Sequence, residues 1–462
     1  MESEKHGLTP RTVTLPADLR ARLESWGPPM LAQVRSTFTK WCRTFGVGLS
    51  DRTFPQVRVG TDCSGADAPI WALRAMGVPF SHIFSCDVNE NAKAFILANS
   101  SPQLIFSDML RRPLEDVPNV DVYVCGFPCT PYSLLRGSRT GLLKEAAAKP
   151  YLVLIRLLRH RRPRMVILEN VIGLSRVMKK VVADLERLGV YRIFIMFIDS
   201  AELGEPVARP RYYFLLLRVD SIIPCNGNDI AAFVGDAISD AKRPVASRLE
   251  ELMMPSDHAL VKASLSTKRT SFRPLKPGTK WIAKHAQLKG AGGPKCSDKA
   301  DSSGLTRWLS PRECDVWAGG LRTGKSGLVV DVSQSIDRAR VRSSGQCGTV
   351  TPRSKICVES AGRVLIPMEK LMLHLLPIHQ MKFPSISNHS LNVLGGNTMH
   401  LKAVGLVLAI GLCLLSTSPT RSLASDVRQE PRLPAVFFGA PTTAKRTGRR
   451  SVGPAPKRRR RA

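Results

Sequence analysis

Between residues 56 and 219, short apolar runs alternate with stretches of helical periodicity, and this alternation restricts the fold more than any other feature of the chain. Seven runs have the length and composition of buried strands: 57–61, 82–87, 104–107, 120–125, 165–169, 192–198 and 212–218. The intervening residues 66–76, 92–99, 150–159 and 177–188 repeat apolar side chains at helical spacing. Such alternation is typical of a parallel sheet covered on both faces. The sequence therefore predicts an α/β, Rossmann-like, doubly wound fold with a mostly parallel, seven-stranded sheet.

The remaining sequence falls into four parts that differ in composition. Residues 1–54 form an N-terminal extension with one helical stretch at 30–45. Residues 221–345 lose the regular alternation and are rich in Lys, Arg, Gly, Ser and Pro, which is typical either of a disordered insert or of a small, irregular domain. Regular patterns return at 346–415, and residues 416–462 are Pro-rich and basic, so we expect a disordered tail there.

The charge of the chain points to a polyanionic partner. Its 462 residues include 68 Lys and Arg against 37 Asp and Glu, which gives a formal charge of +31. Residues 445–461 alone hold nine basic side chains and no acidic one. An excess of this size favours nucleic acid as a partner over a merely solvated basic surface.

Cysteine usage and apolar stretches argue against other classes of protein. The eleven cysteines form no CxxC pair, which predicts free thiols, a reduced compartment and no metal site. No apolar stretch follows an N-terminal positive charge, so we expect no secretion signal. The apolar run 403–415 is too short to cross a bilayer, so we expect a buried helix and no membrane partner.

Polar side chains follow several of the predicted strands at their carboxyl ends. They are Asp62, Cys63, Ser64 and Gly65 after the first strand, Asp87 after the second, Asp108 after the third, and Glu169 with Asn170 after the fifth. Open parallel sheets bind ligands outside the carboxyl ends of their strands, where the strand order reverses. A single acid there is more often a helix cap, but several at one edge predict a ligand site.

Cys129 follows the fourth predicted strand, between two prolines in the segment GFPCTPYS (126–133). The prolines stiffen this segment and favour a loop at the sheet edge. A buried cysteine is usually only a small apolar residue, which is our interpretation of the other ten. A nucleophilic thiolate needs an electropositive, partly exposed setting. We expect four arginines to supply it: Arg136, Arg139, Arg209 and Arg211.

Six segments, in chain order, resemble motifs of the cytosine-5 DNA methyltransferase family. They are DCSGADAP (62–69), GFPCTPYS (126–133), ENV (169–171), GEPVARPRYYFLL (204–216), GRVLIPMEKLMLHLLP (362–377) and GGNTMHLKAVG (395–405). The resemblance covers residues 56–220 and 346–415. LSPREC (309–314) also resembles the fifth motif, which leaves two alignments open there.

The resemblance implies a function for each part of the chain. Residues 55–220 would form the catalytic methyltransferase domain, 221–345 a target-recognition region, and 346–415 a C-terminal return that completes the catalytic domain. The implied enzyme moves a methyl group from S-adenosylmethionine to C5 of cytosine in DNA. Cys129 would attack C6 of the base, Glu169 would hold N3 and the exocyclic amine, and Arg211 would contact the base or a phosphate.

The resemblance also implies two sets of binding residues. Those for the cofactor are Asp87 at the ribose, Asp108 at the adenine, and Asp62, Cys63, Ser64, Gly65 and Asn397 at the methionine end. Those for the substrate are Pro128, Ser133, Asn170, Arg209 and Thr398. The sequence departs from the family pattern at four positions: Asp67 replaces a second glycine, Cys63 an aromatic residue, and Thr130 and Val207 a glutamine each.

Alternative functions remain open on the same fold. One branch of the family modifies transfer RNA, so an RNA cytosine-5 methyltransferase is an alternative. The altered cofactor loop is also compatible with a catalytically silent chromatin-binding protein. A nicotinamide-dependent oxidoreductase would need a GxGxxG turn after the first strand, and the sequence has none there.

Two basic segments predict further contacts. Residues 134–149 combine Gly137 and Gly141 with basic side chains, among them Arg136, Arg139 and Lys144, which is typical of a mobile lid over DNA, although an ordinary surface loop has the same composition. The tail has a basic pair, ten other residues and then KRRRR, which resembles a two-part nuclear import signal. We therefore expect the nuclear import machinery as a partner and the nucleus as the location.

Overall fold

The structure is a computed structural model of the chain. It describes residues 12–47, 54, 56–132, 148–225, 227–266, 305–321, 325–334, 341–343, 345–416 and 434–439. The predicted lid from 134 onward lies outside these residues except for its last two positions, and so does the predicted import signal at 445–461.

All seven predicted strands are present in one large sheet. They are β1 (Val57–Asp62), β2 (Phe80–Cys86), β3 (Leu104–Phe106), β4 (Val122–Cys125), β5 (Met165–Val171), β6 (Tyr191–Ile198) and β7 (Arg211–Arg218). With an eighth strand, β12 (Val436–Phe438), the order across the sheet is β12-β6-β7-β5-β4-β1-β2-β3. Every neighbouring pair is parallel except those that involve β7. The predicted doubly wound α/β fold is therefore confirmed.

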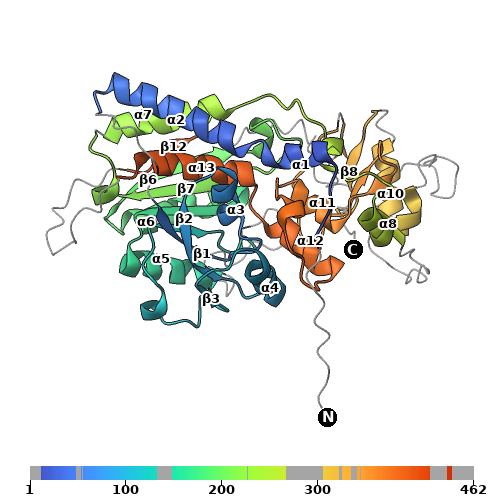
Figure 1. The fold of residues 1–462 in the computed structure, drawn as a ribbon, viewed down its shortest axis with the longest axis horizontal. Coiled ribbons are helices and arrows are strands. Elements are labelled where there is room, and N and C mark those ends of the chain that lie inside the picture. The colour runs from blue at the N-terminus through green and yellow to red at the C-terminus, as the bar shows by residue number, and fades with distance from the viewer. Residues whose placement is uncertain are drawn as a thin grey trace, which may run out of the picture.

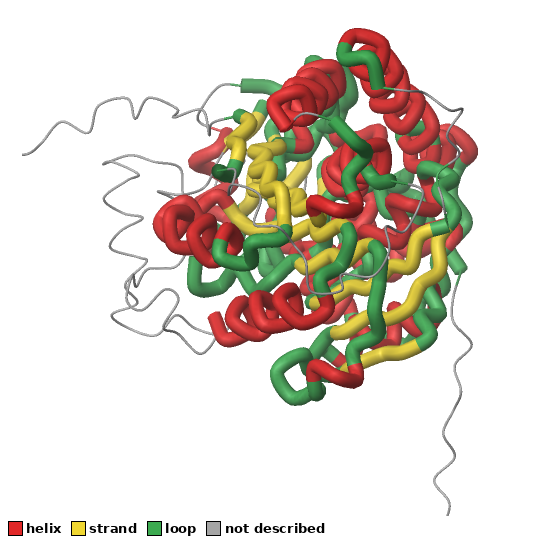
Figure 2. The backbone as a smooth tube through the Cα atoms, turned by 90° about the vertical axis from the view of Figure 1, so that its left-hand side faces the viewer, coloured by secondary structure: helices red, strands yellow, loops and turns green. Residues whose placement is uncertain are grey.

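Helices cover both faces of this sheet (Figures 1 and 2). One face packs on α2 (Gly27–Thr44), α3 (Ala68–Ala75), α4 (Glu90–Asn99), α7 (Gly227–Ala241) and α13 (Leu401–Leu414), and the other on α5 (Lys149–Arg161) and α6 (Met178–Glu186). Helix α5 buries Tyr151, Leu154, Leu157 and Leu158, at the spacing of one helical face. Helix α13 is buried on all sides apart from Lys402, which explains why its sequence is apolar all round.

A second, smaller sheet lies beside the large one and carries its own core. Its strands are β8 (Val329–Asp331), β9 (Val341–Arg342), β10 (Ile356–Val358) and β11 (Arg363–Val364), in the order β11-β10-β8-β9. Helices α8 (Ala259–Ser266) and α10 (Pro311–Leu321) lie next to it (Figure 1), and Trp317 of α10 is buried against Leu305 and Val330. Within the described residues this region is a small domain rather than a disordered insert.

The boundaries predicted for this small domain, 221 and 345, are both wrong. Helix α7 lies inside the predicted 221–345 region, yet it packs beside α2 and buries Phe233 in the core of the large sheet. At the other end, β10 and β11 fall within the predicted 346–415 return but pair with β8. Composition cannot show which sheet a helix covers, because that depends on contacts between distant segments.

The N-terminal extension is also part of the large domain, because α1 (Ala17–Glu24) and α2 bury their apolar faces in its core. The LSPREC segment belongs to α10 of the small domain, whereas 362–377 leads into α11 (Pro367–Met372) beside α12 (Asn388–Asn397). The second alignment of the fifth motif is therefore excluded by position.

The prediction of disorder for the whole tail is wrong at residues 434–439. There β12 pairs in parallel with β6, with Val436 opposite Phe194 and Phe438 opposite Met196. The Glu186 side chain also accepts a hydrogen bond from the Ala435 amide at 3.1 Å. A short apolar run is stable here because an existing strand edge satisfies its backbone groups.

No single helix in the described part of the chain is long and apolar enough to cross a membrane. Only α12 and α13 taken together reach that length, with a bend of 40° between them.

Candidate functional site

A cavity of about 1210 Å³ opens at the carboxyl ends of the central strands. Strand order reverses between β1 and β4, which are neighbours in the sheet although β2 and β3 separate them in the sequence. Asp62, at the end of β1, pairs with Cys125, at the end of β4. The loops that follow these strands form one side of the cavity, and the small domain with α12 forms the other. This is where an open α/β sheet binds its ligands.

Cys129 lies in a loop that is anchored on both sides. Phe127 is buried against the rings of Tyr132 and Tyr151, and its carbonyl accepts a hydrogen bond of 2.9 Å from the Asn170 side chain. The Cys129 carbonyl accepts a hydrogen bond of 2.9 Å from the Tyr132 amide. These contacts hold the half-buried thiol on the cavity wall.

Glu169 and Arg211 form a buried ion pair on the same wall, with 2.7 Å between Oε1 and Nε. Strand β7 runs antiparallel to β5, so its first residue, Arg211, lies opposite Val171 at the far end of β5. Because β7 runs in the opposite direction, Arg211 at its start lies at the edge where the parallel strands end. Glu169 is the first residue of β5 beyond its pairing with β4, which ends at Leu168. It therefore lies at the same edge, on the cavity wall.

The electrostatic setting of Cys129 combines opposing effects. Burial, followed by the Glu169 charge, raises the pKa of Cys129 above its ordinary value, although Arg211 and Arg209 act in the opposite direction. The two arginines thus have the predicted effect, but burial and the carboxylate outweigh them. Arg136 and Arg139 lie outside the described residues. The thiol is therefore mostly protonated at neutral pH in the free protein.

This raised pKa predicts how alkylation of Cys129 depends on pH. Below its pKa, the reactive thiolate fraction grows about tenfold per pH unit, so the alkylation rate by iodoacetamide should still be rising at pH 9. Mass spectrometry of the peptide that contains Cys129 distinguishes it from the other ten cysteines. Glu169→Gln, which removes one cause of the shift, should move the curve to lower pH. A plateau below pH 8.5 in the wild-type protein would contradict the assigned setting.

Arg209 joins the two walls of the cavity. It is buried, and its terminal nitrogens donate to the carbonyl of Val350 in the small domain at 3.1 Å and to that of Gly396 in α12 at 3.3 Å. Burial, and then the nearby charge of Arg211, lower the pKa of Arg209. Only Nε has no partner among the described residues. Its substrate contact remains a prediction, whereas its contacts across the cleft are present.

The loop after β1 and the ends of β2 and β3 form a second compartment of the cavity. Asp87 holds this loop in place, because its carboxylate accepts hydrogen bonds of 2.8 Å from the amides of Gly65 and Asn89. Asp108 accepts one from the Leu110 amide at 2.8 Å. Each carboxylate keeps further lone pairs for a ligand. Apolar side chains, including Val88 and Met109, lie between them on the cavity wall.

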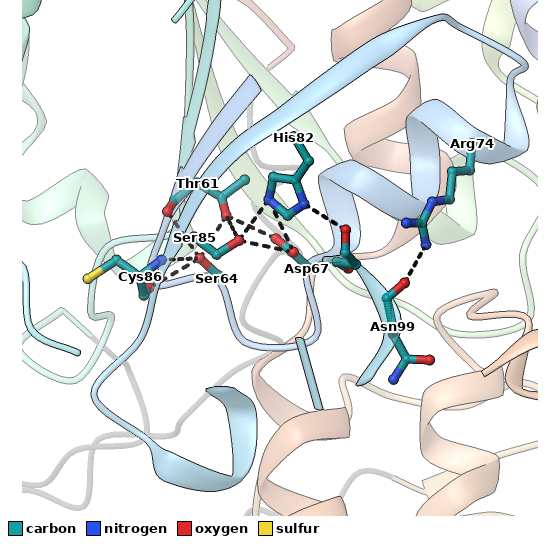
Figure 3. A network of polar contacts seen from close by, with 9 residues as sticks. Thr61, Ser64, Asp67, Arg74, His82, Ser85, Cys86 and Asn99 are labelled. Atoms are coloured by element: carbon teal, nitrogen blue, oxygen red, sulfur yellow. Dashed lines mark hydrogen bonds and ion pairs between the residues drawn. The ribbon is translucent and has the colours of Figure 1, made fainter. Parts of the chain in front are cut away.

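Behind the loop after β1, a buried polar network surrounds Asp67 (Figure 3). Asp67 is fully buried with φ +57°, and its carboxylate accepts hydrogen bonds from the Thr61 hydroxyl at 2.9 Å and the Ser85 hydroxyl at 3.1 Å. The His82 ring lies 3.6 Å away, and the Ser64 hydroxyl contacts that of Thr61 at 2.7 Å. The residue that replaces the usual glycine thus anchors the loop to β1 and β2.

Loss of one of the two acceptor oxygens of Asp67 should therefore destabilise the protein. Asp67→Asn keeps the size of the side chain and tolerates the left-handed backbone, but it leaves buried donors poorly matched. We expect the free energy of unfolding to fall by about 1–3 kcal/mol, measured by denaturant titration. Asn89→Asp, at the half-buried N-cap of α4, keeps an acceptor for the cap hydrogen bonds and provides a control that should change stability little. An unchanged midpoint for Asp67→Asn would show that the network contributes nothing.

A smaller cavity of about 30 Å³ lies beside the large one. It shares Cys63, Gly126, Glu169 and Asn397 with the large cavity. It is also lined by four polar residues that the large cavity lacks: Thr61, Asp62, Ser64 and Thr398. The Thr398 hydroxyl and one oxygen of Asp62 are buried without a partner among the described residues.

The structure brings most of the predicted site residues together. Ten line the large cavity: Cys63, Gly65, Asp87, Asp108, Pro128, Cys129, Glu169, Arg209, Arg211 and Asn397. Asn170 lines neither cavity. Its amide donates to the Phe127 carbonyl and accepts from the Val171 amide, which positions the loop of Cys129, and its contact with substrate stays a prediction. Ser133 lies outside the described residues.

The cavity wall that the small domain contributes was not predicted from the sequence. Residues 347–353 line the large cavity, together with Asp331 and Gln334. No periodicity marks these residues; their only signal was a position between two recognised motifs. Among the described residues, no group of three or more potential metal ligands occurs.

The sequence is similar to those of several known proteins. The sequence profile described as C-5 cytosine-specific DNA methylase matches residues 63–357. The DNA (cytosine-5-)-methyltransferase DMT5 of Cryptococcus neoformans is 23% identical over 416 residues, which cover 77% of this chain and 17% of that protein. The type II methyltransferase M.Bsp6I of a Bacillus species is 30% identical over 145 residues, which cover 30% of this chain and 45% of its own.

Among solved structures, the Dnmt2 methyltransferase of S. pombe matches 77% of this chain and 98% of its own, with 15% identity and a TM-score of 0.45. This chain spans less than half the length of the two sequence relatives. The matched profile includes more than half of the 462 residues, among them Cys129, Glu169 and Arg211. The chain therefore belongs to the C-5 cytosine-specific DNA methylase family.

Proposed function

We propose that this protein is an S-adenosylmethionine-dependent DNA (cytosine-5-)-methyltransferase that acts through a covalent adduct at Cys129. The observation that carries the proposal is the shared cavity wall of Cys129, Glu169 and Arg211, next to a compartment with two carboxylates and apolar walls. The residues of that compartment fit a nucleoside. Asp87 offers acceptors for ribose hydroxyls, Asp108 offers one for the adenine amine, and Val88 and Met109 offer apolar surface.

S-adenosylmethionine, when bound, supplies an electrophilic methyl group on a sulfonium. The protein has to make cytosine C5 a nucleophile. The Cys129 thiolate attacks C6, a bond forms between sulfur and carbon, and the electron pair of the C5–C6 double bond becomes available at C5. The thiol proton leaves to solvent before this attack. After the methyl group is accepted, C5 gives its proton to a water molecule, the electron pair of the C5–H bond re-forms the C5–C6 double bond, and the bond from sulfur to C6 breaks, which restores the aromatic ring and the thiolate.

Glu169 and Arg211 stabilise the charge that this attack places on the ring. A proton held between the Glu169 carboxyl group and N3 compensates that charge, and the ion pair with Arg211 fixes the carboxyl group in position. The target base has to leave the stack to reach this buried wall, at a cost of a few kcal/mol. The cavity of about 1210 Å³ has room for a base and a cofactor together.

The substrate class is tested by measuring methyl transfer from labelled S-adenosylmethionine to duplex DNA and to transfer RNA in parallel. We expect incorporation into DNA at C5 of cytosine and none above background into transfer RNA. The reverse preference would favour an RNA enzyme. DNA binding without transfer or cofactor binding would favour a silent chromatin-binding protein.

The remaining assignments also belong to this proposal. The small domain of β8, β9, β10 and β11 would contact DNA as the target-recognition domain, and 445–461 would bind the nuclear import machinery and bring the enzyme to the nucleus. The charge of the tail supports both DNA attraction and import.

A further inference from the structure

Arg112 is a buried arginine that the proposed reaction does not use. It follows β3, and its side chain is only 4% exposed. The guanidinium carbon lies 5.3 Å from the ring centre of Phe84 and 4.9 Å from that of Phe106. One terminal nitrogen is paired with Oδ2 of Asp62. Burial of a guanidinium is costly unless it is paired, so the position of this arginine depends on Asp62.

Tyr123 contacts the same carboxylate from β4. Its hydroxyl donates to Oδ2 of Asp62 at 2.6 Å. Burial would lower the pKa of Arg112, but the Asp62 and Tyr123 groups outweigh it and raise that pKa, so the guanidinium stays charged. Both donors use one oxygen of the carboxylate. The other oxygen, Oδ1, is buried without a partner among the described residues.

Asp62 belongs to the wall of the smaller cavity, which also includes Asn397 and Thr398. A volume of about 30 Å³ exceeds the roughly 10–15 Å³ that one water needs, so it admits an ammonium-sized group but no nucleoside. The residues that this cavity shares with the large one join it to the compartment of Asp87. A short polar chain attached to a nucleoside could therefore reach Asp62 from that compartment.

We propose that Arg112 and Tyr123 are positioning residues that hold Asp62 by one oxygen, so that its other oxygen receives the ammonium group of the aminocarboxypropyl chain of S-adenosylmethionine. This inference rests on the proposed function. The arginine has two effects: it provides a buried carboxylate with a cation as its partner, and it fixes the orientation of that carboxylate. The Asp67 network holds the same loop from the other side of β1, so the loop is fixed on both faces.

Two ligands distinguish the positioning of Asp62 by Arg112 from a general effect of the substitution on the cofactor pocket. S-adenosylhomocysteine carries the aminocarboxypropyl chain, whereas 5′-methylthioadenosine keeps the nucleoside and the thioether but lacks that chain. In calorimetric titrations, Arg112→Met should weaken S-adenosylhomocysteine binding about 10- to 100-fold and leave 5′-methylthioadenosine binding unchanged. Tyr123→Phe should have a smaller effect of the same kind. Arg74→Met is the matched control. Like Arg112, Arg74 stacks on an aromatic ring, but it donates to the Asn99 carbonyl instead of a carboxylate and lines neither cavity.

A second pair of variants covers the case in which Arg112→Met folds poorly. The double variant Asp62→Asn with Arg112→Met removes both buried charges and should restore stability without restoring the preference for S-adenosylhomocysteine. Arg112→Lys, which keeps the charge, should restore part of the affinity.

The inference is overturned if Arg112→Met weakens both ligands by the same factor, or if it leaves S-adenosylhomocysteine binding unchanged. Failure of the proposed function gives a different result. In that case the wild-type protein prefers S-adenosylhomocysteine but forms no adduct with cytosine at Cys129.

Discussion

Replacement of Cys129 by serine is expected to abolish covalent trapping on a duplex that contains 5-fluorocytosine. Fluorine at C5 cannot leave as a proton does, so the wild-type enzyme should remain bound to the base through the bond between sulfur and C6. A serine hydroxyl is a far weaker nucleophile at neutral pH, since it is almost fully protonated. We expect methyl transfer to unmodified DNA to fall by about three orders of magnitude or more, equivalent to about 4 kcal/mol in the barrier.

Denaturing electrophoresis measures the adduct, and incorporation of labelled methyl groups measures the transfer. Cys225→Ser is the matched control, because Cys225 is half-buried and lines neither cavity. This control should trap as the wild-type protein does. Equal trapping by Cys129→Ser would assign the nucleophile to another residue and remove the basis of the proposed mechanism.

Glu169→Gln should give the second largest effect. The amide keeps the size of the side chain but can neither hold the proton at N3 nor pair with the Arg211 charge. Removal of one group that stabilises developing charge typically costs about 10²–10³ in kcat. The loss should appear in kcat much more than in the KM for DNA, since the interaction strengthens as the adduct forms.

Steady-state kinetics with duplex DNA measure this division between kcat and KM. Glu202→Gln is the control, because Glu202 pairs with an exposed lysine outside both cavities. A Glu169→Gln enzyme with normal kcat and weakened DNA binding would show that Glu169 only helps to hold the substrate.

The central strands of the large sheet could be predicted because each is an apolar run buried on both faces, whereas β3 at the sheet edge is only partly buried. The edge that holds Cys129, Glu169 and Asp87 followed from this, since residues after parallel strands meet at one edge. The antiparallel direction of β7 could not be read from composition, yet it decides where Arg211 lies. Motif resemblance placed Arg211 correctly at the site without that knowledge.

Other features could not be predicted because they depend on contacts between distant segments. β12 has only three residues and exists through its pairing with β6. Nothing in the sequence distinguishes Arg112 from the other basic residues, and its contact with Asp62 appears only in the folded chain. The two hydrogen bonds by which Asn170 holds the loop of Cys129, to the backbone of Phe127 and Val171, also appear only in the folded chain.

The burial of α13 has a consequence for how the protein is made. This helix, Leu401–Leu414, packs against α2, α3, α7 and the sheet, although the strands it covers are complete by Arg218. On the ribosome, nearly two hundred residues must therefore follow the last of those strands before the apolar face is closed. During that interval the nascent chain exposes surface that promotes aggregation, so its yield should depend on chaperones that act before synthesis ends.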